Sequence, residues 1–317
     1  MDCMKTHVRE YEIVQCMGEG GSGTVYVVIH PNTGAYLAMK EFASVQDGER
    51  EAAILLSLKI PGIPNCLDCF CEDGKYYLVM DYVEGRSLRD CTEENYDGKV
   101  QILKKLAGLV SCLHTLSVPL IHGDLKPENV IVGDDGEVFL IDFGSAFRIS
   151  NPPKVFKGSP GFAAPELREG KCGTESDVYS FGKLMLYLFC GRNPLPEYEE
   201  PEPGVLLRMG IRREHAKLIV KCLKNSPKER FHSMVEATEK MRKKKRNAWN
   251  LSGFIIKLGA VLSFGGIWLY AERDWQKGKY LILAGCVLLV GEMLVKGYER
   301  RLSEEEFGRT FSVFLSE

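Results

Sequence analysis

The stretch Ile121-His122-Gly123-Asp124-Leu125-Lys126-Pro127-Glu128-Asn129, together with the later Asp142-Phe143-Gly144, decides how this chain folds and what chemistry it can support. Asp124 can orient a hydroxyl group, and Lys126 can neutralise phosphate charge. Asn129 and Asp142 offer the oxygen ligands that Mg²⁺ prefers. The two segments therefore supply the chemical groups that phosphoryl transfer requires.

A glycine-rich pattern lies upstream, in Gly18-Glu19-Gly20-Gly21-Ser22-Gly23-Thr24-Val25. Glycine has no Cβ, so backbone amides in such a segment can approach phosphate oxygens closely. Residues 24–29 are β-branched and aromatic, and the turn signal Pro31-Asn32-Thr33-Gly34 follows them. We therefore expect the glycines to join two strands and not to open a helix.

A third strand is expected over residues 35–42, where Leu37-Ala38-Met39-Lys40 places a lysine among apolar residues. An amphipathic helix should follow, because Ile54, Leu55 and Leu58 recur at helical spacing after Arg50-Glu51.

These segments, in this order, resemble the eukaryotic-type serine/threonine protein kinases, and the bacterial, membrane-anchored members in particular. The resemblance continues through Gly158-Ser159-Pro160-Gly161-Phe162-Ala163-Ala164-Pro165-Glu166, then residues 176–182, then Pro227-Lys228-Glu229-Arg230. It covers about residues 8–245 and implies a bilobal α+β fold, with an N-lobe over 8–83 and a C-lobe over 84–245. Family members pair the arginine of the last motif with the Ala-Pro-Glu glutamate.

The resemblance also implies roles for individual residues. Asp124 should accept or orient the substrate hydroxyl, Lys126 should stabilise the transferred phosphoryl group, and Lys40 should pair with Glu51 to position the α- and β-phosphates. Asn129 and Asp142 should hold Mg²⁺, with Mn²⁺ as the alternative metal. The expected ATP site comprises Gly18, Glu19, Gly20, Gly21, Ser22, Gly23, Val25, Ala38, Lys40, Met80, Asp81, Val83 and Ile131.

For the apolar members of that site, ordinary core packing is the alternative, because pocket and core differ little in composition. Lys126 and Ser159 resemble the pattern of serine/threonine specificity, so the implied substrates are protein hydroxyls.

Gly123 departs from the family, which most often has arginine before the catalytic aspartate and pairs it with an activation-loop phosphate. We expect activity that does not require that phosphate. His-Gly-Asp is also common in small-molecule phosphotransferases of related fold, so such an enzyme is one alternative. A pseudokinase scaffold is the other, although no position that supplies phosphate, metal or base contacts is missing.

Composition limits the other possibilities. The formal net charge of −2 argues against a nucleic-acid-binding protein, and 45% hydrophobic residues suffice for a sizeable core. The 11 cysteines are scattered, as expected for reduced thiols. Cys66, Cys69 and Cys71 suggest zinc only weakly, since no second ligand pair stands at the usual spacing; structural cysteines are the preferred interpretation.

The C-terminal part changes character after a basic run of six residues between Lys240 and Arg246. Residues 251–270 carry one charge, Lys257, and would span about 30 Å as a helix, the thickness of a bilayer core. A shorter apolar segment, 280–295, contains Glu292. The pattern predicts a two-helix transmembrane hairpin over 251–298 that contacts the lipid bilayer.

A juxtamembrane linker over 246–250 and a cytoplasmic tail over 299–317 complete the expected organisation. Basic residues flank the outer ends of both spans, so the kinase domain is expected on the cytoplasmic side of the cell membrane. A buried or interfacial helical hairpin is the alternative. Whether the protein forms a homodimer stays open.

Overall fold

The computed structural model describes residues 6–21, 23–91, 94–153, 158–191 and 199–241. Ser22, the linker, the predicted hairpin and the tail lie outside the described residues. The chain divides into two compact units, Met1–Met241 and Arg242–Glu317, and the description below concerns the first. Among the described residues, no helix combines the length and the apolar character needed to cross a bilayer.

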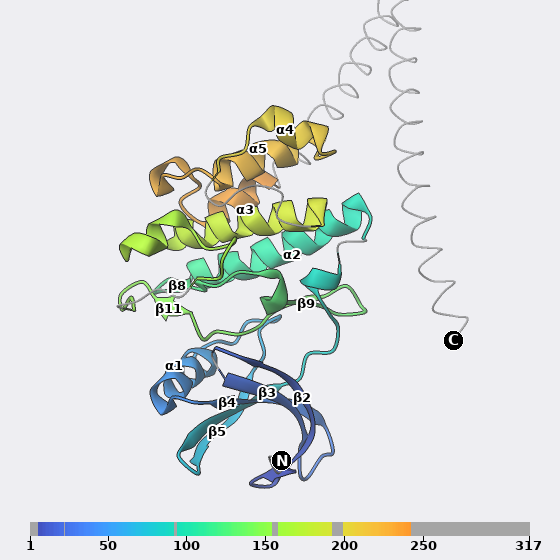
Figure 1. Cartoon of the computed structure of the whole chain (residues 1–317), viewed down its shortest axis with the longest axis vertical. Coiled ribbons are helices and arrows are strands. Elements are labelled where there is room, and N and C mark those ends of the chain that lie inside the picture. The colour runs from blue at the N-terminus through green and yellow to red at the C-terminus, as the bar shows by residue number, and fades with distance from the viewer. Residues whose placement is uncertain (1–5, 22, 92–93, 154–157, 192–198, 242–317) are drawn as a thin grey trace, which may run out of the picture. The chain divides into compact units, whose positions relative to one another are not determined.

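The smaller lobe is an antiparallel sheet of six strands in the order β1-β2-β3-β4-β6-β5, with one helix, α1 (Figure 1). The predicted strands at 24–29 and 35–42 are confirmed to within one residue. The elements are β1 (His7–Val8), β2 (Tyr11–Gly20), β3 (Gly23–Ile29), β4 (Tyr36–Phe42), α1 (Val45–Leu56), β5 (Cys66–Glu72) and β6 (Lys75–Asp81).

Helix α1 begins where Ser44 accepts a hydrogen bond from the backbone N–H of Asp47 through its side chain. Its apolar face contains the buried residues Ala52, Ile54 and Leu55, as the periodicity predicts. Glu51 lies on the same buried face with only 1% of its surface exposed. A buried carboxylate requires a partner, so this position already points to the site described below.

The larger lobe is mainly helical, with α2 and α3 side by side at its centre (Figure 1). Its helices are α2 (Tyr96–His114), α3 (Thr174–Cys190), α4 (Pro203–Arg208) and α5 (Arg213–Cys222), and residues 234–241 are also helical. Short strands form two small sheets: β7 (Arg86–Ser87) with β9 (Val130–Val132) and β10 (Val138–Leu140), and β8 (Leu120–Ile121) with β11 (Phe147–Arg148). Single-turn 3₁₀ helices are η1 (Leu88–Asp90), η2 (Pro127–Asn129), η3 (Pro165–Glu169) and η4 (Pro227–Glu229).

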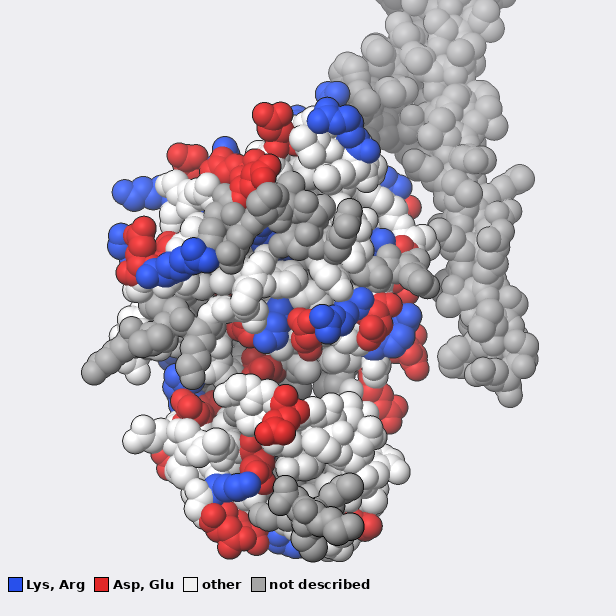
Figure 2. Space-filling view, in the orientation of Figure 1, with Lys and Arg blue, Asp and Glu red and all other residues white. Residues whose placement is uncertain are grey.

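Leu103, Leu106, Val110 and Leu113 form an apolar stripe on α2 and are fully buried. Helix α3 is a core helix that packs against both α2 and α5. The predicted bilobal α+β fold is therefore confirmed for the described residues. Figure 2 shows acidic and basic side chains interspersed over one face of both lobes, in keeping with a net charge close to zero.

A buried ion pair connects η3 to the segment after η4. Arg230 Nη1 and Nη2 donate to Glu166 Oε1 and Oε2 at 2.7 and 2.8 Å, and the exposed fraction of Arg230 is 1%. Arg230 also donates to the carbonyls of Lys224 and Asn225, so nearly all its donors are used. The pair that the family resemblance implies is confirmed.

Arg230→Ala should lower the free energy of unfolding by about 3–5 kcal/mol, because the Glu166 carboxylate would stay buried without its partner. Arg212→Ala is the matched control: Arg212 donates to Asp97 at 2.6 Å on the surface, where such a pair contributes about 1 kcal/mol or less. Equilibrium chemical denaturation of both variants measures the difference. Equal losses would contradict the assignment of Arg230 as a structural anchor.

Candidate active site

The site is centred on Lys40, which β4 places between α1 and the segment that follows β10. Its Nζ donates to Glu51 Oε1 and Oε2 at 3.0 and 2.8 Å and to Asp142 Oδ1 at 2.8 Å. Lys40 itself is only 3% exposed. The predicted Lys40–Glu51 ion pair is therefore present, and the same ammonium group also reaches a predicted metal ligand.

The two carboxylates around Lys40 differ in their electrostatics. Burial alone would lower the pKa of Lys40, but Glu51 and Asp142 outweigh it and raise that pKa above its usual value. Burial raises the pKa of Glu51 to about 7, against the opposing effect of Lys40. The pKa of Asp142 is lowered, because contact with Lys40 outweighs the effect of burial. Asp142 is therefore the more strongly ionised of the two acids, as a metal ligand should be.

The loop at residues 122–129 joins the predicted catalytic residues through direct contacts. Lys126 Nζ donates to Asp124 Oδ2 at 2.7 Å and to Ser159 Oγ at 3.2 Å. The backbone N–H of Ser159 donates to Asp124 Oδ1 at 3.1 Å. Each oxygen of the Asp124 carboxylate thus accepts a hydrogen bond, which fixes the orientation of the carboxylate. Through Ser159, the segment before the Ala-Pro-Glu motif lies next to Asp124.

Asn129 and Asp142 each keep oxygen capacity for a cation. Asn129 uses its amide nitrogen to donate to the carbonyl of Asp124 at 2.9 Å, which leaves its amide oxygen available as a ligand. Asp142 accepts hydrogen bonds from Lys40 and from the Gly144 N–H through Oδ1. Its Oδ2 is a second oxygen that can serve as a metal ligand. One amide and one carboxylate, completed by substrate phosphates, form a typical Mg²⁺ environment, so the residues fit the predicted metal.

The predicted nucleotide-binding residues of the smaller lobe share one face of its sheet. Val25 of β3 pairs with Lys40 of β4, and Ala38 of β4 pairs with Met80 of β6. Directly paired residues point to the same face of a sheet, so these four side chains lie together. Ile131, in contrast, lies on β9 of the larger lobe, paired with Phe139.

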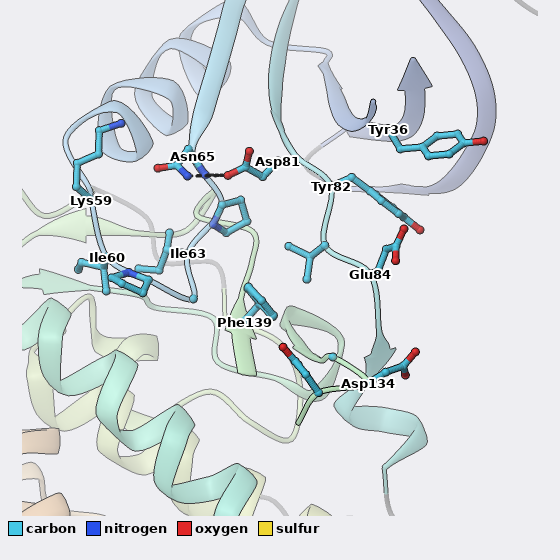
Figure 3. A pocket seen from close by; sticks show the side chains of 16 residues that line it. Tyr36, Lys59, Ile60, Ile63, Asn65, Asp81, Tyr82, Glu84, Asp134 and Phe139 are labelled. Carbon is cyan, nitrogen blue, oxygen red and sulfur yellow. Dashed lines mark hydrogen bonds between the residues drawn. The ribbon is translucent and has the colours of Figure 1, made fainter. Parts of the chain in front are cut away.

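Asp81 and Val83 are placed differently from the rest of the predicted nucleotide site. Asp81 pairs with Leu37, on the opposite face of the sheet from Ala38, and its carboxylate accepts from the backbone N–H and Nδ2 of Asn65 at 2.9 and 2.7 Å. Both Asp81 and Val83 line a cavity behind this segment (Figure 3). The side chain of Asp81 therefore does not share the sheet face of Ala38 and Lys40.

The glycine-rich segment joins β2 to β3, as expected, with Gly18, Glu19 and Gly20 in β2. A Cβ at Gly18, Gly20 or Gly21 would meet no atom of a neighbouring segment within 4 Å, so these positions have room for a ligand. Ser22, the remaining member of the predicted set, lies outside the described residues.

Gly23 has a second structural reason to be glycine. Its φ is +136°, and a Cβ would lie 2.0 Å from the carbonyl oxygen of Glu41 in β4. The close approach of β4 therefore requires glycine here, whether or not a phosphate binds.

Sequence reasoning used Asp177 only as a family marker and missed its role in positioning the catalytic loop. Asp177 Oδ2 accepts from the backbone N–H of His122 and from His114 Nε2, and Oδ1 accepts from the N–H of Gly123, each at 2.9 Å. Burial would raise the pKa of Asp177, but the hydrogen bond with His114 and its charge lower it. A carboxylate within the apolar run of α3 was the available signal, because such a group must be paired.

Two arginines hold the segment after Asp142. Arg50 of α1 donates to the carbonyl of Gly144 at 2.5 Å, and Arg148 donates to the Val118 carbonyl at 3.1 Å and to Ser57 Oγ at 2.9 Å. These contacts attach the described part of this segment to α1 and to the residues around it. Whether activity requires a phosphate on this segment stays a prediction from Gly123.

Gly123 itself has a φ of +77°, and a Cβ there would lie 2.8 Å from the carbonyl oxygen of Ser145. The catalytic loop and the segment after Asp142 thus approach each other too closely for any side chain. Glycine at this position is a requirement of the backbone as well as a departure from the family pattern.

The fold and the connected set around Lys40, Asp124 and Asp142 define the class of two-lobed phosphotransferases that bind a nucleotide with a divalent metal. Comparison with known proteins refines this. Residues 11–246 match the family model of the protein kinase domain. The chain belongs to the protein kinase family, which confirms the resemblance seen in its sequence.

Similar proteins come from bacteria and eukaryotes. A probable serine/threonine-protein kinase of Clostridium perfringens is 28% identical over 75% of this chain and 38% of its own length. Serine/threonine-protein kinase D of Synechocystis is 29% identical over 70% of this chain and 50% of its own. Mitogen-activated protein kinase kinase 7 of Arabidopsis thaliana is 29% identical over 77% of this chain and 82% of its own length. The chain thus spans half or less of the two bacterial relatives.

Gly123→Ala should lower the free energy of unfolding by about 1–3 kcal/mol, because alanine is strained at this φ and its Cβ would press on Ser145. Gly108→Ala is the matched control. Gly108 lies inside α2 with nothing within 4 Å of an added Cβ, so alanine should stabilise the protein by about 0.5–1 kcal/mol. Denaturation curves for the two variants should shift in opposite directions, and shifts of the same sign would refute this account.

Proposed function

We propose that this protein is an ATP-dependent serine/threonine protein kinase that transfers the γ-phosphoryl group of ATP to Ser or Thr hydroxyls of proteins. The observation that carries the proposal is the connected site: Lys40 contacts both Glu51 and Asp142, and Lys126 contacts both Asp124 and Ser159. The names of the similar bacterial and plant proteins support the substrate class.

In this mechanism Asp124 orients the substrate hydroxyl and accepts its proton, since its carboxylate is fixed on both sides by Ser159 and Lys126. Lys126 brings positive charge to the transferred group. Lys40, held by Glu51, positions the α- and β-phosphates. Asn129 and Asp142 would hold Mg²⁺ or Mn²⁺, which neutralises phosphate charge when bound.

Two alternatives have less support. A small-molecule phosphotransferase would not need the buried Glu166–Arg230 pair and the Ser159 contact, which fix the segment where family members bind peptides. A pseudokinase scaffold is disfavoured because the lysine, the catalytic acid and the metal ligands are all in place.

Lys40→Met and Asp142→Asn should each lower turnover by at least about a hundredfold, because each removes charge that positions phosphate or metal. Lys104→Met, which removes an exposed lysine on α2, should leave turnover unchanged. The measurement is metal- and ATP-dependent transfer of radiolabelled phosphate to a generic Ser/Thr substrate, with circular dichroism to verify folding. Transfer at the wild-type rate by both site variants would disprove the assignment.

We also propose that residues 251–298 anchor the kinase to a membrane as a two-helix hairpin, preceded by the linker at 246–250 and followed by a cytoplasmic tail at 299–317. The length and apolar character of the first segment and the basic flanks support this organisation. The basic run between Lys240 and Arg246 would then lie next to anionic lipid.

Single cysteines placed at Gly278 and Glu317 test the predicted topology. A membrane-impermeant maleimide applied to intact cells should label Gly278→Cys and leave Glu317→Cys unlabelled, because the turn is expected outside and the tail inside. Permeabilised cells serve as the control in which both sites react. The reverse labelling pattern would show that the orientation is wrong.

A further inference from the structure

A cavity of about 840 Å³ lies behind the segment that connects β6 to β7 (Figure 3). We call residues 81–84 the hinge and this cavity the rear groove. Its walls are the loop 59–65 between α1 and β5, the hinge, and the turn 133–135 after β9, with Tyr36 and Phe139 completing the lining. The volume falls within the usual range for ligand pockets of about 300–1,000 Å³.

The rear groove is separate from the candidate active site. Ala38, Lys40 and Met80 do not line it, and Asp81 faces it from the opposite side of the sheet. A ligand in the rear groove would therefore be distinct from the nucleotide.

Backbone contacts hold the walls of the rear groove in place. The carbonyl of Gly62 accepts from the N–H of Leu140 at 2.8 Å, and a Cβ at Gly62 would lie 2.8 Å from Leu109. Asn65 and Asp81 are joined through both backbone and side-chain hydrogen bonds. A wall fixed in this way favours binding, because little conformational entropy is lost when a ligand enters.

The acidic residues on the rim of the rear groove gather at one end. Glu84 and Asp134 lie at one end, and Lys59 lies at the other (Figure 3). Glu84, Asp134 and the next residue in the chain, Asp135, are all exposed. The nearby cations Arg86 and Lys105 offset this charge only in part. Arg86 also interacts with Asp134, but it is paired with Glu94 at 3.1 Å, and Lys105 is paired with Glu137 at 2.7 Å. The acidic end should therefore attract positively charged groups.

The floor between the two ends is apolar. Ile60, Ile63 and Phe139 lie there, and Tyr36 is 54% exposed beside the hinge. Acidic rim and apolar floor together match a chain segment that carries basic side chains next to aliphatic ones.

We propose that the rear groove docks an extended segment of a protein substrate, with Lys or Arg side chains at Glu84, Asp134 and Asp135 and aliphatic side chains on the floor. The proposal rests on the proposed kinase function. Docking outside the catalytic site would raise the local concentration of the phosphoacceptor, so it should lower KM and leave kcat unchanged.

Binding can be measured without catalysis. A fluorescein-labelled peptide, Arg-Arg-Gly-Leu-Gly-Leu, should bind the full chain in a fluorescence anisotropy titration, whereas versions with Glu in place of Arg or Ser in place of Leu should bind more weakly. The triple variant Glu84→Gln, Asp134→Asn, Asp135→Asn should bind the first peptide at least about fivefold more weakly, and raised salt should weaken wild-type binding because exposed charges are screened. Failure of the peptide to bind the wild-type chain would overturn the proposal.

The control variant is Glu12→Gln, Glu202→Gln, Glu239→Gln, which removes the same charge from exposed positions outside the rear groove. It should bind the peptide as the wild type does, and an equal loss in both triple variants would overturn the proposal by showing that only net charge matters. An unlabelled peptide of residues 239–247 is a further competitor. If it displaces the probe at lower concentration than unlabelled Arg-Arg-Gly-Leu-Gly-Leu, the groove binds the chain's own basic run and substrate docking is wrong.

A kinetic assay then tests the link to catalysis. A Ser/Thr substrate joined to Arg-Arg-Gly-Leu-Gly-Leu by a flexible linker should have at least about a fivefold lower KM than the same substrate without it, with equal kcat, and the groove variant should lose this difference. Equal KM values in an active enzyme would overturn substrate docking. Loss of all transfer with peptide binding retained would instead contradict the proposed kinase function and leave the groove as a peptide-binding site.

Discussion

The buried ammonium group of Lys40 is the constraint on which the arrangement of the lobes depends. It is the shared partner of a carboxylate from α1 and one from the segment after β10, and leaving such a group buried without a partner costs several kcal/mol. Helix α1 and Asp142 must therefore both lie within hydrogen-bonding distance of Lys40 on β4. The position of the helix and the position of a metal ligand are consequently set by the same contact.

The larger lobe uses the same principle at two further places. Asp177 fixes the backbone at His122 and Gly123, and Arg230 fixes Glu166, so two loops that differ in sequence are both attached to the helical core by buried charges. The catalytic loop and the Ala-Pro-Glu segment then approach each other through Ser159. Geometry at Asp124 thus depends also on Asp177 and Arg230, whose side chains are buried.

Residue patterns in the sequence were sufficient for the strands around the glycines and for α1, and the family resemblance implied the Lys40–Glu51 and Glu166–Arg230 pairs. The sequence was insufficient where distant backbone segments meet. The contact of Gly23 with β4 and the rear groove formed by 59–65, 81–84 and 133–135 leave no periodic pattern in the chain. The transmembrane hairpin lies outside the described residues and stays a prediction.

The turn between β2 and β3 has a consequence for how long a nucleotide stays bound. At Gly18, Gly20 and Gly21 no neighbouring segment lies within 4 Å of an added Cβ, so this part of the hairpin is open to a ligand, whereas β4 packs closely at Gly23. Ordering it around phosphates must then draw on the free energy of binding, which weakens affinity and speeds dissociation. Since release of product often limits turnover in enzymes, a hairpin tip that is open at these glycines favours rapid exchange of spent nucleotide over tight retention.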